Sequence, residues 1–446
     1  MGNETVAFRR AASQRGANHR WKVLGVGFAA NASFSAAFSG IPTTAVFVRS
    51  GYHLDNHGLG LVLGMLGLGI AVSELPWGLL TDRWGDRRVL LLGLLSTAAA
   101  LAGMALFVAP GGTYVPDLTM LALGLLLVGL LGGSVNGSSG RAVMAWFREG
   151  ERGLAMSIRQ TAVPAGGGLG ALVLPALVSH FGFASAYAVL AAACALTAAF
   201  AWCWLHEPAH PDEGADRARN AAAAAVPGAA VAAGAPPRTV SPLRDIGIWR
   251  VALGAGALCV PQLAVLTFGT VFLHDFGRAG VLAISVTMAA VQTGAAIARV
   301  WSGGWTDRRG NRRAYMRGCS VLTAGLFAAL ALVTGFGGMH HAATTAVLAP
   351  MVVLGGVSAS AWHGVAFTEM ATLAGTRRAG TALAMGNTCV FLTLFLTPLA
   401  IPPLLAMGSW PVVWAVASAC ALIALPVFPR TVRVSRLTSP RACDAT

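Results

Sequence analysis

Four ionisable residues stand inside long apolar stretches of this chain: Glu74, Arg159, Arg299 and His363. An ionisable side chain is costly to keep in apolar surroundings, so it commonly binds a ligand, pairs with an opposite charge or carries a proton. A guanidinium presents a planar fork of donors that fits a carboxylate or a phosphate. An imidazole changes its charge near neutral pH, as a proton carrier must. These residues therefore indicate anion binding and proton transfer.

The stretches that hold these residues are predicted to be membrane-spanning helices. Hydrophobic residues make up 56% of the chain and charged residues 11%, whereas soluble domains are about a quarter charged. About 20 consecutive apolar residues suffice to cross a bilayer as a helix. We expect an all-α membrane protein with twelve spans, near 22–47, 57–81, 88–109, 118–142, 153–178, 183–204, 249–273, 279–304, 314–336, 344–371, 380–406 and 409–428.

A segment rich in Ala, Gly and Pro separates the sixth and seventh predicted spans, and such a composition is typical of a linker. The chain is therefore expected to fold as two bundles of six helices. The predicted divisions are an N-terminal tail (1–21), an N-terminal six-helix bundle (22–204), a linker (205–248), a C-terminal six-helix bundle (249–428) and a C-terminal tail (429–446).

The net charge of +14 does not indicate nucleic-acid binding, because the basic residues are scattered singly in the connectors rather than gathered on one face. Alternate connectors carry almost all of them, which is the pattern of the positive-inside rule. Both termini, the linker and both tails are expected in the cytoplasm, with the protein in the plasma or bacterial inner membrane and no cleaved signal peptide. Seven cysteines without a CxxC pair predict neither a disulfide framework nor a metal site.

One eleven-residue pattern, G-x-x-x-D-R-x-G-x-R-R, occurs twice, each time where a predicted helix ends on the basic side. Its copies are 307 − 82 = 225 residues apart, which indicates an internal duplication. Glu74 and Arg299 each precede the Asp of their copy by eight residues and so occupy equivalent depths. The fixed positions are Gly78, Asp82, Arg83, Gly85, Arg87 and Arg88 in the first copy, and Gly303, Asp307, Arg308, Gly310, Arg312 and Arg313 in the second.

The duplicated pattern, the helix count and the central linker resemble the major facilitator superfamily (MFS) over essentially the whole chain. That resemblance implies two pseudo-symmetric six-helix bundles around a cavity that opens alternately to each side. It also implies that the pattern acts as a latch, in which Asp82 and Asp307 face positive helix N-termini across the bundle interface. The arginines of the pattern would then bind nearby acids. A simply solvated loop would explain the arginines but not the fixed Gly and Asp.

In the resembled fold Arg159 and Arg299 could face one cavity at similar depth, where a bound anion would relieve their repulsion. Alternatively, Glu74 neutralises one of them permanently, or the arginines only extend to the membrane surface. His363 is either a proton-coupling residue, together with Glu74, or an ordinary hydrogen-bonded helix residue. Further candidate substrate ligands are polar residues on the helices that line the cavity in this fold: Asn31, Asn136, Gln160, Gln262, Gln292 and Asn387.

The preferred interpretation is a transporter for a small organic anion, a carboxylate, working by uniport or as a proton symporter. One alternative is proton-driven efflux of hydrophobic drugs, favoured by Pro164, Gly167 and Gly168, which match part of an efflux signature. Another is a solute sensor with a transporter-like fold. No residues have the spacing of a catalytic site, so we expect no enzyme activity and no cofactor. The expected partners are the small-molecule substrate, the lipid bilayer and protons, with the protein a monomer.

Overall fold

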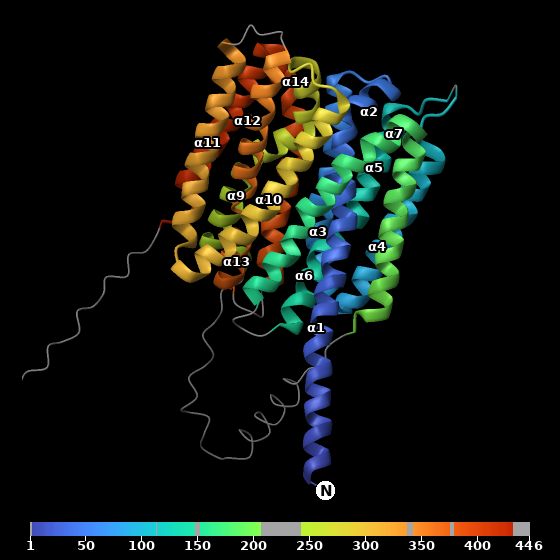
Figure 1. Ribbon diagram of the computed structural model, residues 1–446, viewed down its shortest axis with the longest axis vertical. Helices are drawn as coiled ribbons and strands as arrows, with labels where there is room; N and C mark the ends of the chain where they lie inside the picture. The colour runs from blue at the N-terminus through green and yellow to red at the C-terminus, as the bar shows by residue number, and fades with distance from the viewer. Residues whose placement is uncertain are drawn as a thin grey trace, which may run out of the picture.

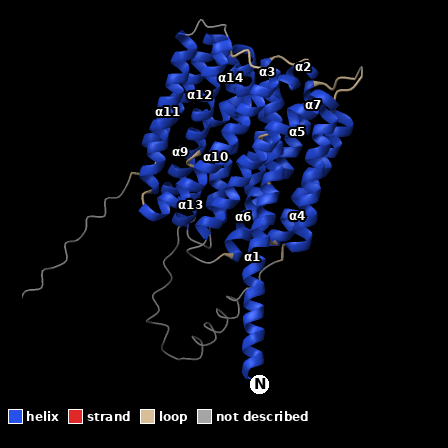
Figure 2. Ribbon diagram, viewed as in Figure 1, coloured by secondary structure: helices blue, strands red, loops and turns tan. Residues whose placement is uncertain are grey.

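The computed structural model describes residues 2–112, 114–147, 152–206, 242–336, 342–374 and 379–430. Within these ranges the regular secondary structure is helical (Figure 2), apart from one isolated bridge between Gly111 and Tyr114. The all-α class predicted from the sequence is confirmed. Most of the predicted linker 205–248 and of the C-terminal tail 429–446 lies outside the described residues.

The first half comprises the following helical elements along the chain. They are α1 (Gly2–Phe38), η1 (Ile41–Thr44), α2 (Ala45–Gly51), α3 (Asn56–Trp84), α4 (Asp86–Gly103), η2 (Met104–Val108), α5 (Leu118–Gly132), α6 (Ser134–Trp146) and α7 (Arg152–Trp204). The second half comprises η4 (Pro242–Arg244), α9 (Ile246–Val271), η5 (Phe272–Phe276), α10 (Val281–Arg309), α11 (Arg312–Phe336), α12 (Ala342–Ser360), α13 (His363–Ala374) and α14 (Ala379–Val427).

Ten helical segments of the described chain are long and apolar enough to cross a membrane. Two of them, in α7 and α14, have 51 and 48 residues, about twice what one span requires. Both contain non-helical residues, Gly182 in α7 and Gly408 with Ser409 in α14. The two glycines are 408 − 182 = 226 residues apart, close to the spacing of the duplicated pattern. If each of these two long helices forms two membrane spans, the ten segments correspond to twelve spans. The number of twelve spans stays a prediction.

The two halves of the chain lie side by side as two groups of helices (Figure 1). Across the interface α3 packs against α14, and α7 packs against α10. The α3–α14 contact is close because α3 presents glycines: a methyl group at Gly67 would lie 2.7 Å from the backbone of Leu394 and Phe395. Without a hydrophobic drive between helices in lipid, such close backbone packing stabilises the contact.

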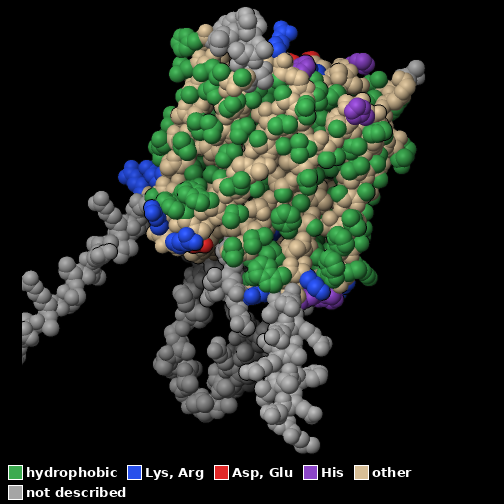
Figure 3. Space-filling view, viewed as in Figure 1, with side chains coloured by type: hydrophobic (Ala, Val, Ile, Leu, Met, Phe, Trp, Pro, Cys, Tyr) green, Lys and Arg blue, Asp and Glu red, His purple; other side chains and the backbone are tan. Residues whose placement is uncertain are grey.

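The outer surface of the helices carries large exposed apolar side chains, such as Leu282 at 77% exposure and Leu106 at 76%, and apolar atoms spread over the visible face (Figure 3). Lys and Arg gather instead towards the end nearest the N-terminus. We call this end the N-terminal face; it includes Trp204 and Ala374. The other end is the opposite face, which includes Arg49 and Asp275. The apolar surface between them confirms that this is an integral membrane protein.

Candidate functional site

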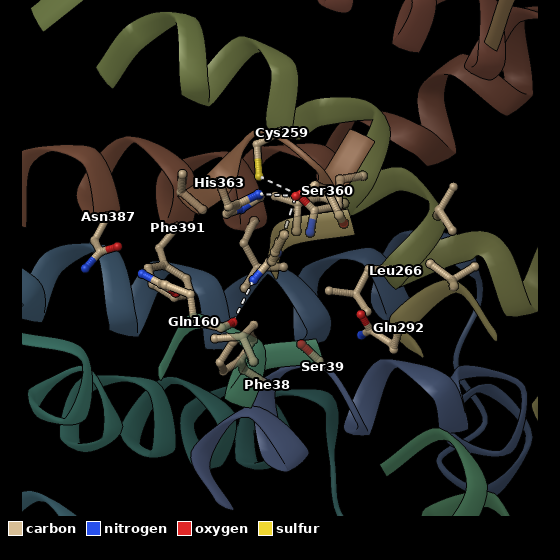
Figure 4. A pocket seen from close by; sticks show the side chains of 18 of the residues that line it. Phe38, Ser39, Gln160, Cys259, Leu266, Gln292, Ser360, His363, Asn387 and Phe391 are labelled. Atoms are coloured by element: carbon tan, nitrogen blue, oxygen red, sulfur yellow. Dashed lines mark hydrogen bonds between the residues drawn. The ribbon is translucent and has the colours of Figure 1, made fainter. Parts of the chain in front are cut away.

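A cavity of about 70 Å³ lies between the two halves of the molecule (Figure 4). Its walls come from α1, α6 and α7 on one side and from α9, α10, α13 and α14 on the other. Eight residues singled out in the sequence line it: Asn136, Arg159, Gln160, Gln262, Gln292, Arg299, His363 and Asn387. Asn31 and Glu74 are buried behind the wall. The two arginines thus face one cavity, whereas their role as substrate ligands stays a prediction.

Arg159 is 4% exposed and reaches the cavity from the start of α7. Its Nη2 donates to the carbonyl oxygen of Asn136 at 2.5 Å and to Ser139 Oγ at 2.9 Å, and its Nε donates to Ser139 Oγ at 3.1 Å. Nη2 also lies 3.4 Å from Asn31 Oδ1. All these acceptors are uncharged. Gly140 lies against the guanidinium, and a methyl there would make an ordinary contact of 3.5 Å with Arg159 Cζ.

Arg299 is 1% exposed and spans the interface. Its Nη1 donates to the carbonyl oxygen of Gln160 in the other half at 3.1 Å, and its Nε donates to that of Ser360 at 3.3 Å. The Ser360 carbonyl is available because α12 ends at this residue and α13 begins only at His363, so the last carbonyls of α12 have no intrahelical donor. A break in the tenth predicted span therefore supplies the acceptor.

Glu74 is 1% exposed and lies behind Asn136, whose Nδ2 donates to Glu74 Oε1 at 2.7 Å. Asn387 approaches the same carboxylate from α14. The ion pairs found within the described ranges do not include Glu74, Arg159 or Arg299. Asn136 thus separates the carboxylate from Arg159: its side-chain amide donates to Glu74, and its backbone carbonyl accepts from Arg159. In this conformation Glu74 does not neutralise either arginine directly.

The contacts of Glu74 and Arg299 are related by the internal duplication. The two residues are 299 − 74 = 225 positions apart, and their partners Gln160 and Asn387 are 387 − 160 = 227 positions apart. Glu74 contacts Asn387 in the second half, and Arg299 contacts Gln160 in the first half. Because Gln160 and Asn387 occupy equivalent positions, the two contacts are equivalent across the interface. Equivalent positions in the two halves carry opposite charges.

His363 stacks on Trp362 with 3.9 Å between ring centroids, and its Nδ1 lies 3.2 Å from the Ser360 carbonyl oxygen. If Nδ1 donates to this oxygen, Nε2 is left as the nitrogen that can exchange a proton. The proton-coupling role stays a prediction. In the part of the chain that the structure covers, no group of three or more His, Cys, Asp or Glu side chains is placed to hold a metal ion.

The glycines of the duplicated pattern have clear structural reasons. Gly85 and Gly310 follow α3 and α10 with φ of 85° and 61°, a region that residues with a side chain rarely adopt. Gly303 lies against the other half of the molecule, where a methyl would approach Ser157 Oγ to 2.8 Å, whereas a methyl at Gly78 would make an ordinary contact of 3.8 Å with Ala384. Three of the four fixed glycines therefore permit a tight turn or a close interface.

The charged residues of the pattern make contacts within their own halves. Asp307 accepts from Arg312 Nη2 at 2.9 Å, and Arg313 pairs with Glu369 at 2.7 Å. Arg87 donates to the Trp202 carbonyl and lies 4.8 Å above its ring. The Asp82 side chain and the segments that precede α7 and α14 are outside the described part. The latch role stays a prediction.

The sequence reasoning missed an ion pair at the opposite face. Arg49 Nη1 and Nη2 donate to Asp275 Oδ2 and Oδ1 at 2.7 and 2.8 Å, and Nη1 also donates to Asn56 Oδ1 at 3.1 Å. Because Arg49 belongs to α2 and Asp275 to η5, the pair joins the two halves of the molecule. In the sequence the pair is indicated only by a basic residue, Arg49, after the first predicted span and an acidic residue, Asp275, after the seventh.

Comparison with known proteins gives the same assignment. The family model described as Major Facilitator Superfamily matches residues 26–398. An uncharacterised MFS-type transporter of Mycobacterium tuberculosis is 28% identical over 415 residues, 93% of this chain and 86% of that protein. Two probable anion transporters of rice match shorter parts: one is 30% identical over 29% of both chains, and a chloroplastic one is 27% identical over 43% of this chain and 34% of its own. The chain belongs to the major facilitator superfamily.

Proposed function

We propose that this MFS transporter moves a small organic anion, a carboxylate, by alternating access of the central cavity. The observation that carries the proposal is the burial of two guanidiniums, Arg159 and Arg299, at one cavity, where their hydrogen-bond partners among the described residues are all uncharged. Buried charges are normally paired, because an unpaired one loses its hydration. A carboxylate entering the cavity would supply the missing negative charge and fit the planar donors.

The arginines keep donors for a ligand. Arg299 Nη2 and Arg159 Nη1 have no hydrogen-bond partner within the described residues. The amide side chains of Gln160 and Gln292 also line the cavity and add uncharged donors. The names of the two rice relatives, which refer to anion transport, support an anionic substrate, although those matches cover less than half of this chain.

We further propose that the N-terminal face is cytoplasmic and that the protein resides in the plasma membrane. Lys and Arg gather at that face (Figure 3), as the positive-inside rule requires of a cytoplasmic side. The opposite face would then be external, and the Arg49–Asp275 pair would close the external side in this conformation.

Proton coupling is the mechanism we propose for energising transport, with Glu74 and His363 as the proton-binding groups. The Glu74 carboxylate is linked to Arg159 through Asn136, so a change in its charge would alter the field at the anion site. His363 lines the same cavity. Symport of a proton with a carboxylate would keep the total charge in the cavity unchanged between the empty and the loaded carrier.

The experiment is uptake by purified protein in proteoliposomes, after a thermal-shift screen of carboxylates and lipophilic cations has identified ligands. Arg159→Lys and Arg299→Lys should each abolish most uptake, as the Ala variants do, because an ammonium cannot reproduce the planar fork. Arg278→Lys is the matched control, since Arg278 is exposed on the opposite face, and it should leave uptake unchanged. Normal uptake of a carboxylate by both Ala variants would refute the proposal, and stabilisation by lipophilic cations alone would favour drug efflux.

A further inference from the structure

The lining of the central cavity differs between its two ends. In the part of the cavity towards the N-terminal face lie Arg159, Arg299 and His363. They are 159 − 152 = 7, 309 − 299 = 10 and 374 − 363 = 11 residues from the helix termini at that face. At 1.5 Å per residue these positions are about 10 to 16 Å deep. The two guanidiniums and the imidazole thus form one layer, which we call the cationic layer after its two arginines.

A second layer lies deeper and is apolar. Leu266, Met288 and Val291 are 266 − 246 = 20, 309 − 288 = 21 and 309 − 291 = 18 residues from the same face, or about 27 to 32 Å. Between the two layers the rings of Phe38 and Phe391 meet edge to face across the interface with 5.5 Å between their centroids. Phe391 is 391 − 379 = 12 residues from the same face, or about 18 Å. We call Leu266, Met288 and Val291 the apolar layer.

In Figure 4 Asn387 and Phe391 lie towards one side of the cavity, His363, Gln160 and Ser360 nearer the middle, and Leu266 and Gln292 on the other side. Gln292 and Arg299 are seven residues apart on α10, so they share one face about 10 Å apart. The Gln292 amide packs over Gly167, and within the described ranges it donates to no other side chain or carbonyl. No cation lines the apolar layer in that part of the chain.

We infer that the substrate is a monocarboxylate with an apolar body, held with its carboxylate in the cationic layer and its body beside Phe38 and Phe391, pointing towards the apolar layer. This inference rests on the proposed function and narrows it. The arginines match one planar carboxylate, and the side chains of Leu266, Met288, Phe38 and Phe391 match methylene or ring carbons. Gln292 can accommodate one uncharged polar substituent near the far end of the body.

The same layering disfavours two other classes of anion. A dicarboxylate bound in the cationic layer by one group would place its second group beside the apolar rings of Phe38 and Phe391 or deeper, towards Leu266, Met288 and Val291. Burying a charge there without a partner is strongly unfavourable. Inorganic phosphate is small and polar on all sides, so it would leave the apolar layer without a contact. The cavity therefore discriminates by the body of the anion as well as by its charge.

The test is isothermal titration calorimetry of the full-length protein in nanodiscs with two homologous series. One series is the linear monocarboxylates from acetate to hexanoate, and the other is the dicarboxylates from malonate to adipate. Each methylene buried should improve the affinity for a monocarboxylate about fourfold until the apolar layer is filled. The dicarboxylates should bind at least about tenfold more weakly than monocarboxylates of equal length, and phosphate should not bind.

Variants separate the two layers. Arg299→Ala should weaken binding of every monocarboxylate by a similar factor and so preserve the gain per methylene. Met288→Ala should reduce the gain per methylene while leaving acetate binding unchanged. Leu282→Ala, a change of an exposed side chain on the same helix, is the control and should alter neither quantity. Monodispersity and an unchanged unfolding temperature establish that each variant is folded.

Failure of this inference can be distinguished from failure of the proposed function. If dicarboxylates bind as tightly as monocarboxylates and Arg299→Ala abolishes that binding, the arginines form an anion site but the inference is wrong. A monocarboxylate series with no dependence on length would also refute it. If neither series binds, or if both bind to Arg159→Ala and Arg299→Ala as to the unmodified protein, the proposed function is wrong as well.

Discussion

Loss of the Arg49–Asp275 pair should shift the protein towards the state in which the opposite face is open. The pair joins the two halves only while that face is closed. Its free energy of interaction therefore stabilises the closed state relative to the open state. The two side chains are 23% and 34% exposed, so the full Coulomb energy at this distance is screened. A partly exposed, bidentate pair contributes about 1 kcal/mol, which corresponds to a shift of about fivefold in the conformational equilibrium.

The measurement uses Ser39→Cys in a background without native cysteines, because Ser39 lines the cavity and is 1% exposed. A membrane-impermeant maleimide applied from the opposite face should alkylate this cysteine about fivefold faster after Arg49→Ala. The exchanged pair Arg49→Asp with Asp275→Arg should restore the slow rate. In 1 M salt the difference between Arg49→Ala and the parent should shrink, because the Debye length falls to about 3 Å.

An unchanged alkylation rate in Arg49→Ala would refute this reasoning and would assign closure of the opposite face to apolar packing alone. So would a charge exchange that stays as fast as Arg49→Ala while the protein remains folded. His274, which lies 2.7 Å from Asp275 Oδ1, remains near the carboxylate in the single variant. For that reason we expect a partial shift rather than a fully open protein.

Three further predictions follow from the fold. Asp82→Asn should lower the rate of transport up to about fivefold, because it weakens the proposed contact with a helix N-terminus. Calorimetry should show an unchanged Kd for the identified substrate. Loss of binding in a folded variant would contradict the latch. Gly67→Val should lower the unfolding temperature measured by differential scanning fluorimetry, because its side chain would meet the α14 backbone at about 2.7 Å; an unchanged temperature would show that the contact is not close. Reporter fusions after Gly85 and Gly310 should be active in the cytoplasm and one after Gly112 outside, and the reverse pattern would refute the proposed orientation.

The depth of the two arginines could be predicted from the sequence because it depends only on helix rise and on the duplicated pattern. Their common cavity required the resemblance to a known fold, since nothing local brings Arg159 and Arg299 together. The acceptor carbonyl of Ser360 could not be predicted, because the interruption between α12 and α13 has no proline at the break. A break of this kind depends on how neighbouring helices pack.

Other contacts were beyond sequence reasoning because they join distant parts of the chain. Arg49 and Asp275 are 226 residues apart, and neither belongs to a recognisable pattern. The position of Asn136 between Glu74 and Arg159 depends on the mutual rotation of α3, α6 and α7, which periodicity alone does not determine. The apolar layer was missed because its residues have the composition of every other membrane helix.

The opposite charges at the duplicated positions Glu74 and Arg299 determine how the membrane potential acts on the carrier. An axis along the membrane normal relates the two halves in this fold, so the two charges lie at equal depth and their separation is parallel to the membrane. The membrane potential, which varies only along the membrane normal, therefore does not distinguish the two positions. It acts on the sum of the charges at the site. With Glu74 ionised, the empty site carries one positive charge together with Arg159, and a monocarboxylate that enters with a proton leaves this charge unchanged. Each full charge moved through 100 mV involves about 2.3 kcal/mol. In the proposed symport cycle this work on the loaded carrier would be reversed on the return of the empty carrier, so the full cycle would be electroneutral.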